Sequence, residues 1–196
     1  MQPTLLDAIQ QRYACRQFAA DRPVPASELA LLLEAGRLAP SAFGLEPWRF
    51  VTVVDATQRA AVARACFDQP AATSAAAFIV IVALVDALHP DSDYVGARFG
   101  AEARGTDTAP IMAAYRALYH AESIVAWAQG QCHFAAAQML LQAAHRGLGS
   151  CPIGGFDPAA LAAALAIPTG EQPALVIALG YCREAAPERL RKPLDT

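Results

Sequence analysis

The longest helical pattern in the chain, SIVAWAQGQCHFAAAQMLLQAAHR at residues 123–146, is apolar on nearly every side. A surface helix of a globular protein normally keeps one polar face toward water, whereas a helix that is apolar all round has to be covered. The cover can come from the protein's own core or from a partner in an obligate interface. The sequence therefore predicts that this helix lies in the core or at an obligate interface.

Charge is scarce along the whole chain. Charged residues make up 17% of the 196 residues, and the formal net charge is -3. Soluble domains usually carry about 25%. The length and the 55% hydrophobic content suit one domain with a substantial core, so we expect a single domain over residues 1–196. A large face buried against a second copy would explain the shortage of charge.

Neither end of the chain nor its apolar runs indicate a membrane protein. The longest apolar run, residues 75–85, is too short for a membrane span, which needs about 20 residues. The N-terminus carries Asp7 and lacks the basic start and apolar stretch of a secretory signal. We therefore expect a cytoplasmic protein that has neither a membrane nor a nucleic acid as its partner.

Hydrophobic periodicity and turn residues divide the chain into helices and a few strands. Helices are expected over residues 5–12, 27–39, 57–67, 110–120, 123–146 and 157–165, with Ser27 and Thr57 as N-caps. Strands are expected over residues 50–55, 77–85 and 173–182. Because helices alternate irregularly with few strands, the fold class is α+β rather than a doubly wound sheet. Residues 86–108 read as a long, partly helical excursion of the kind that often covers a site.

A stiff connection joins the second helix to the first strand. Residues 37–50, RLAPSAFGLEPWRF, combine two prolines, a glycine, a serine and large aromatic residues. Proline fixes its own backbone angle and restricts the residue before it, so this segment has a defined shape where a simple turn would do.

Two groups of residues could bind a ligand. Arg12 and Arg16 are four residues apart, and Arg189 and Arg191 lie in a proline-flanked tail. Guanidinium groups from both ends of the chain could clamp a phosphate, although spacing alone favours solvated surface arginines. In GLGSCPIGGF, residues 147–156, adjacent glycines could let the backbone approach a planar ligand, or the segment could be a helix end followed by a turn.

Most catalytic motifs are missing from the sequence. There is no nucleophilic triad, no nucleotide-binding glycine motif and no histidine pair with metal-ligand spacing. His133 reads as a core histidine. The five cysteines are odd in number and lack C-x-x-C spacing, which argues against a disulfide framework or a zinc site and favours small buried hydrophobes. We therefore name no catalytic residue and no metal site, and an enzyme of this kind needs a cofactor with its own reactivity.

The motifs taken together resemble the nitroreductase family of flavin enzymes. The matching segments, in the order of that family, are RYACRQF (12–18), APSAFGLEPWRF (39–50), GLGSCPIGGF (147–156) and RLRKP (189–193). The resemblance covers nearly the whole chain and outweighs the surface reading of the arginines. It implies a nitroreductase-like α+β fold, with a mostly antiparallel central sheet flanked by helices. It also implies an obligate homodimer with FMN bound at the interface.

The resemblance assigns the cofactor contacts residue by residue. Those expected at the phosphate and ribityl chain are Arg12, Tyr13, Ala14, Arg189 and Arg191. Arg16 would face the N1–O2 edge of the flavin. The segment expected along the ring face is Pro152, Ile153, Gly154 and Gly155. The partner chain's wall of the pocket would be Pro40, Ser41, Ala42 and Gly44, with Trp48 anchoring that loop in the core.

Three of the departures from the family pattern concern residues assigned to the cofactor site. Ala14 replaces a serine, which removes one hydroxyl from the phosphate site, and Gly154 stands where some relatives carry glutamate. Near the flavin edge the chain offers Asp68 or Gln69. An acid there would disfavour an anionic reduced flavin unless Asp68 turns away, so Gln69 is the alternative.

The activity that the resemblance implies is oxidoreduction. Hydride would pass from NADPH or NADH to FMN and then to a nitroaromatic or quinone-like acceptor at the same place, giving a ping-pong mechanism. Residues 86–119 would select the acceptor, with Tyr115 and Tyr119 either covering the site or packing between helices. The alternatives are a specialised flavin enzyme that uses no nicotinamide and a non-enzymatic dimer that binds or senses FMN.

Overall fold

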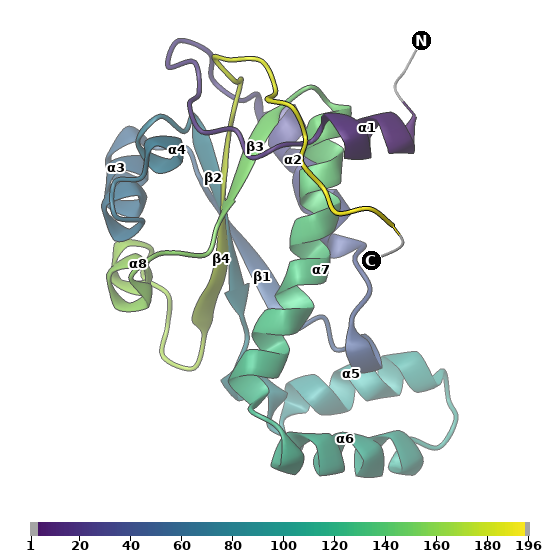
Figure 1. Ribbon diagram of the computed structural model, residues 1–196. Helices are drawn as coiled ribbons and strands as arrows, with labels where there is room; N and C mark the ends of the chain where they lie inside the picture. Colours follow the sequence, from purple (N-terminus) through teal and green to yellow (C-terminus); the bar gives the residue numbers. More distant parts are fainter. Residues whose placement is uncertain (1–3, 195–196) are drawn as a thin grey trace.

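A four-stranded antiparallel sheet forms the centre of the computed structural model, which describes residues 4–194 (Figure 1). Its strands are β1 (Trp48–Val53), β2 (Ala77–Ala83), β3 (Gly149–Ile153) and β4 (Gln172–Gly180). They lie in the order β1-β2-β4-β3, and each neighbouring pair is antiparallel. The α+β class and the antiparallel central sheet are therefore confirmed. The single domain over residues 1–196 stays a prediction, since residues 1–3 and 195–196 lie outside the described residues.

Helices cover both faces of the sheet (Figure 1). On one face lie α1 (Leu5–Gln11), α2 (Ala26–Arg37) and α7 (Ile124–His145), and on the other α3 (Ala56–Ala65), α4 (Pro70–Thr73) and α8 (Pro158–Ala164). β2 is buried at every position, which explains its continuous apolar sequence. Its side chains alternate between two clusters: Ile79 and Ile81 face α7, whereas Phe78 and Val80 face α3 and α8.

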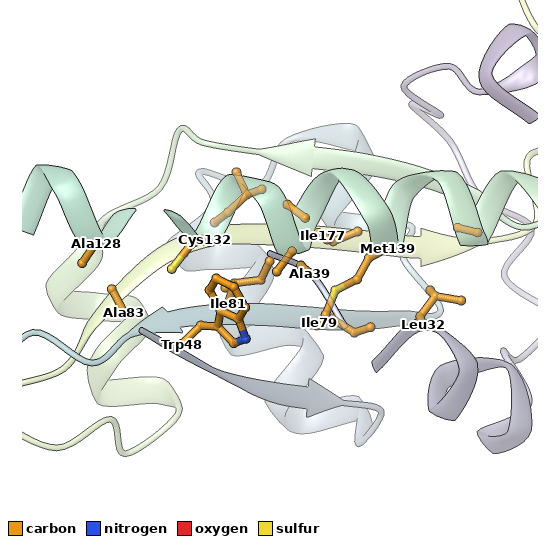
Figure 2. Packing of buried hydrophobic residues seen from close by; sticks show 14 of the residues in the cluster. Leu32, Ala39, Trp48, Ile79, Ile81, Ala83, Ala128, Cys132, Met139 and Ile177 are labelled. Carbon is orange, nitrogen blue, oxygen red and sulfur yellow. The ribbon is translucent and has the colours of Figure 1, made fainter. Parts of the chain in front are cut away.

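One face of α7 fills the core beside the sheet. Figure 2 shows Cys132 and Met139 of α7 close to Ile81 and Ile79 of β2. The buried residues of this helix are Ala128, Cys132, Ala135, Ala136, Met139 and Ala143. Its other face is open in the single chain. His133 is exposed there rather than buried as expected, with Nδ1 2.7 Å from the Gln129 carbonyl oxygen.

The excursion after β2 is an ordered helical hairpin. It consists of η2 (Asp86–Leu88), α5 (Asp93–Ala103) and α6 (Ala109–Ala121), and it extends from one end of the molecule (Figure 1). Tyr115 is fully buried, and its hydroxyl donates a 2.6 Å hydrogen bond to the Leu88 carbonyl. Helix packing is therefore the role of Tyr115.

Two helix starts differ from the sequence prediction. α2 begins at Ala26 behind Pro25, whose angles (φ -60°, ψ 144°) suit proline, so Ser27 lies inside the first turn. α3 is capped by Asp55, whose carboxylate accepts from the Gln58 amide at 2.9 Å, rather than by Thr57. A carboxylate is also favoured by the helix dipole, which explains why this cap prevails.

The strand β3 was not predicted from the sequence. Glycines stand at the start of this strand and directly after its end, as they do in turns, and Pro152 interrupts the residue pattern of a strand. Proline is tolerated here because β3 is an edge strand.

Cys15 and Cys182 form a disulfide that joins the first motif to the end of β4. The odd number and scattered positions of the cysteines predicted no disulfide framework. That prediction was wrong for this pair, because the fold brings together residues 167 positions apart. Cys66, Cys132 and Cys151 are buried free thiols, as expected. Within residues 4–194, no helix combines the length and apolar character needed to cross a membrane.

Candidate functional site

The first motif lies along the ends of two strands. The chain leaves α1 in an extended conformation at Arg12. The Cys15 amide donates to the Ser150 carbonyl at 3.0 Å, and the Ala19 amide donates to the Tyr181 carbonyl at 2.8 Å. These bonds fix residues 12–18 against β3 and against the end of β4. The arginine motif is thereby held next to the strand that leads into the glycine pair.

The C-terminal tail folds back onto the same motif. The Tyr13 hydroxyl donates to the Glu184 carbonyl at 2.8 Å. The Arg189 guanidinium donates to the backbone carbonyls of Gln10 and Arg12. A hollow of about 440 Å³ is lined by side chains from both ends of the chain, among them Arg12, Arg16, Arg189 and Arg191. The predicted convergence of the four arginines is therefore present.

Positive charge accumulates in this hollow. Burial and the nearby charges of Arg189 and Arg191 lower the pKa of Arg12. None of the ion pairs formed within residues 4–194 includes one of the four arginines. A group of like charges without carboxylate partners is stabilised by a bound anion, and guanidinium groups suit phosphate. The donor set thus fits a phosphate group.

Arg22 adds a further cation that the sequence analysis did not identify. Its guanidinium carbon lies 3.6 Å from the centroid of the Tyr181 ring, a cation–π contact. Arg12, Arg22 and Tyr181 line a second hollow of about 330 Å³, which reaches Ala144 near the end of α7. Arg22 lies in a proline-rich turn without periodicity, so no sequence signal marks it.

The glycine segment offers its backbone to a ligand. Pro152, Gly154 and Gly155 are exposed, whereas the Ile153 side chain is buried in the core, so only its backbone could reach a ligand. A Cβ at Gly154 would meet no atom within 4 Å. Packing within the chain therefore does not require glycine at this position. The arginine motif is close to this segment, because Ala14 pairs with Ser150 of β3. The positive charges of Arg16 and Arg12 oppose the rise in the pKa of the Cys151 thiol that burial causes.

Gln69 contacts the glycine pair directly. Its Nε2 donates to the Gly155 carbonyl at 2.8 Å and to the Cys66 carbonyl at 3.0 Å. Asp68 is exposed in a left-handed conformation (φ 48°). The structure thus brings Gln69 to the predicted site.

The loop before β1 has an uncommon backbone. Its 3-10 turn is η1 (Ala42–Gly44), and Phe43, Gly44 and Glu46 have φ values of 59°, 62° and 43°. A left-handed residue other than glycine costs about 1–2 kcal/mol, so surrounding contacts have to hold such a loop. The Ser41 hydroxyl accepts from the Glu46 amide at 2.8 Å, and Trp48, only 7% exposed, anchors the loop in the core as predicted (Figure 2).

Within one chain, this loop is far from the arginines. The Ala42 amide donates to Gln131 of α7 at 2.9 Å, whereas the arginine side of the site reaches Ala144. Thirteen residues of α-helix span about 20 Å. Figure 1 accordingly shows α5, which packs on the loop, and α1 at opposite ends of α7. A single chain does not bring the predicted wall residues, Pro40, Ser41, Ala42 and Gly44, to the arginines and glycines.

Comparison with known proteins decides the family. A family model described as the nitroreductase family matches residues 9–181. The chain belongs to the nitroreductase family. A Thermus thermophilus protein named "NADH dehydrogenase" is 35% identical over 189 residues, which cover 96% of this chain and 91% of that protein. A Staphylococcus haemolyticus protein named as an NAD(P)H nitroreductase is 30% identical over 210 residues, covering 100% and 96%.

A solved structure supports the fold of this nitroreductase-family chain. The protein from Exiguobacterium sibiricum, described as a nitroreductase in complex with FMN, matches with a TM-score of 0.80 and 20% identity. The match covers 98% of this chain and 95% of that one. At this identity the likeness establishes the fold.

Proposed function

We propose that this protein is an FMN-dependent NAD(P)H oxidoreductase that works as a homodimer. The observation that carries the proposal is the convergence of Arg12, Arg189 and Arg191 beside a strand that ends in the open backbone of Gly154 and Gly155. Together these residues provide guanidinium groups that can bind a phosphate and an exposed backbone segment on which a planar ring can lie. Relatives named "NADH dehydrogenase" and NAD(P)H nitroreductase support a nicotinamide as electron donor.

The chain's own residues bind and orient the cofactor. Bound FMN supplies the chemistry of accepting a hydride and passing it on. Arg12, Arg189 and Arg191 would hold its phosphate, and Tyr13 and Ala14 lie beside them in the same hollow. Arg16 contributes a positive charge that favours added negative charge on the cofactor. Gln69 donates a hydrogen bond to the Gly155 carbonyl. This bond fixes the orientation of that peptide group at the end of the segment from Pro152 to Gly155. Because Gln69 donates to the Gly155 carbonyl, we assign the contact beside the glycines to Gln69 rather than to Asp68.

A second copy of the chain would complete the site. Several large apolar side chains of α1, α2 and α7 are exposed in the single chain: Leu5, Leu6, Ile9, Leu31 and Phe134. Leu5, Ala35 and Gln138 line one hollow, so the three helices share a continuous surface. A partner docked on this surface would cover it and could bring its own loop, Pro40 to Gly44, to these arginines. Burial of this face would also account for the low charge content.

The reaction we propose is ping-pong. NADH or NADPH binds first and leaves oxidised, and a nitroaromatic or quinone-like acceptor then takes its place. No acid or base from the chain is required in this scheme, because the cofactor carries the reactive atoms.

Initial-rate measurements with a nicotinamide and a quinone test the shared site. We expect parallel lines in double-reciprocal plots, because the first product leaves before the second substrate binds. Intersecting lines would show that both substrates bind together and would contradict a single shared position.

A further inference from the structure

One face of α5 is occupied by a row of side chains that meet the loop before β1. Tyr94, Arg98 and Glu102 follow one another at intervals of four residues and therefore lie on the same side of the helix. Arg98 makes the most contacts. Its Nε and Nη2 atoms donate to the Gly44 carbonyl at 2.9 and 2.7 Å, and Nη2 also donates to Glu46 Oε1 at 2.6 Å.

The neighbours of Arg98 in this row hold the same segment. The Tyr94 hydroxyl lies 2.7 Å from the Leu45 carbonyl oxygen and 2.9 Å from that of Glu46. A Cβ placed on Gly44 would lie 2.8 Å from Glu102 Oε1, so α5 approaches this glycine closely. Three successive carbonyls, from Gly44 to Glu46, therefore face side chains of α5.

The aromatic residues of the excursion hold the other side of the loop. The Phe43 ring lies 5.4 Å from the Tyr115 ring and 6.3 Å from the Phe99 ring, measured between centroids. Phe43 and Glu46 are both left-handed, and such residues persist where surrounding contacts over-determine the backbone. The contacts from α5 and α6 supply that constraint on both sides of Gly44.

We propose that Arg98 is a positioning residue for the cofactor pocket of the partner subunit. By donating from two nitrogen atoms to the Gly44 carbonyl, Arg98 fixes the shape of the pocket wall from Pro40 to Gly44. The proposal rests on the proposed function, in which this wall closes the FMN site of the other chain. Arg98 does not touch the cofactor; it acts through the loop. A planar fork is needed, because a lysine ammonium cannot direct two donors at one carbonyl while also pairing with Glu46 in the same geometry.

Hydrogen exchange tests the structural half of this proposal without any cofactor. In FMN-free protein, we expect the amides of residues 41–46 to exchange about ten-fold faster in Arg98→Met than in the wild type. The matched control is Arg116→Met, because Arg116 of α6 pairs with Asp91 and has no hydrogen bond to the loop. Unchanged exchange in Arg98→Met would overturn the proposal.

FMN affinity tests the functional half. We expect Arg98→Met to raise the Kd for FMN about ten-fold, Arg98→Lys to raise it about three-fold, and Arg116→Met to leave it unchanged. Arg98→Lys keeps the charge, so it remains informative if Arg98→Met folds poorly. A loosened loop with unchanged FMN affinity would overturn the positioning role. If the wild type binds no FMN, the proposed function fails together with this role, whereas the exchange result still decides whether Arg98 holds the loop.

Mixed dimers show which subunit Arg98 serves. One chain carries Arg12→Ala, which damages its own phosphate clamp, and the other carries Arg98→Met. If Arg98 acts on the partner's site, both defects fall in one site and the other site stays intact, so each dimer binds one FMN with wild-type affinity. If it acts within its own chain, no intact site remains. The reciprocal control places both substitutions on one chain opposite a wild-type chain, and we expect no wild-type site there.

Discussion

The pKa of Arg12 is lowered by burial and by two neighbouring guanidinium groups. Those same features make Arg12 a strong point of contact for an anion, because a bound phosphate removes the repulsion and replaces lost hydration. Arg189 holds the backbone at Arg12 while lining the same hollow, so it orients the motif in addition to adding charge. At the scale of residues, the site is a cluster of cations whose geometry is fixed by backbone contacts.

Arg12→Ala should weaken FMN binding by roughly 1.5–3 kcal/mol, the range for a hydrogen bond to a charged group. Arg191→Ala should act in the same direction. Titration of flavin fluorescence would measure both. Arg64→Ala, at the end of α3 on the opposite helical layer, is the control and should bind FMN like the wild type. Wild-type affinity in Arg12→Ala would remove the phosphate assignment.

The cysteines allow a second prediction at this scale. Burial raises the pKa of the Cys66 thiol to about 11 and that of the Cys132 thiol to about 12. At pH 8 a raised pKa leaves less reactive thiolate than an ordinary cysteine has, so native protein should resist iodoacetamide. After unfolding without reductant, alkylation should label the three free thiols of Cys66, Cys132 and Cys151 and leave Cys15 and Cys182 unlabelled. Labelling of all five under those conditions, seen by mass spectrometry, would contradict the disulfide.

Among the elements, α7 has two distinct faces. Ala136 lies inside the core at 2% exposure, whereas Phe134 is 50% exposed on the opposite side. A charge at Ala136 would therefore disrupt the fold of the single chain. A substitution at this position does not test the proposed dimer interface separately from folding. The surface of α1, α2 and α7 is where association should be probed.

If the chain forms the proposed dimer, Phe134→Glu should convert it to a monomer or shift the equilibrium strongly toward monomer, because the substitution places a charge in the proposed apolar contact. Size-exclusion chromatography with light scattering would measure the mass. The control is Phe67→Glu, since Phe67 is 65% exposed beyond α3 on the other face of the sheet. A dimeric Phe134→Glu protein would show that the partner does not dock on this face.

Long apolar or strongly periodic segments could be predicted from the sequence. The β2 strand and α7 were located within two residues. Burial on both sides gives β2 a continuous apolar sequence, and α7 is long and apolar on nearly every side although only one of its faces is buried within the chain. The β3 strand was not predicted, since an edge strand with proline and glycine has no such pattern. The caps Ser27 and Thr57 were wrong where nearby Pro25 and Asp55 fit the helix start.

The candidate site was predictable to the extent that its motifs are local. The arginines and the glycine pair could be named from short segments. Contacts such as Arg98 with Gly44, Gln69 with Gly155 and Arg22 with Tyr181 could not, because each joins residues that only the folded chain brings together.

At the scale of the whole molecule, the two halves of the proposed pocket lie about 20 Å apart along α7 in one chain. The arginines and glycines occupy one end, and the loop held by α5 occupies the other. A homodimer related through the exposed face of α1, α2 and α7 would bring the halves together in two equivalent sites. Cofactor binding and dimer formation should then support each other, because each site needs both chains.

The absorption spectrum of the purified protein, saturated with FMN and then desalted, shows whether the protein retains a flavin that a nicotinamide can reduce. We expect flavin bands that survive desalting and bleach when NADPH or NADH is added without oxygen. Bands that survive but never bleach with either nicotinamide would indicate a flavin protein with another electron donor or a sensing role. Absence of retained flavin would contradict the account, because the converging arginines and the open glycine backbone would then have no cofactor to hold.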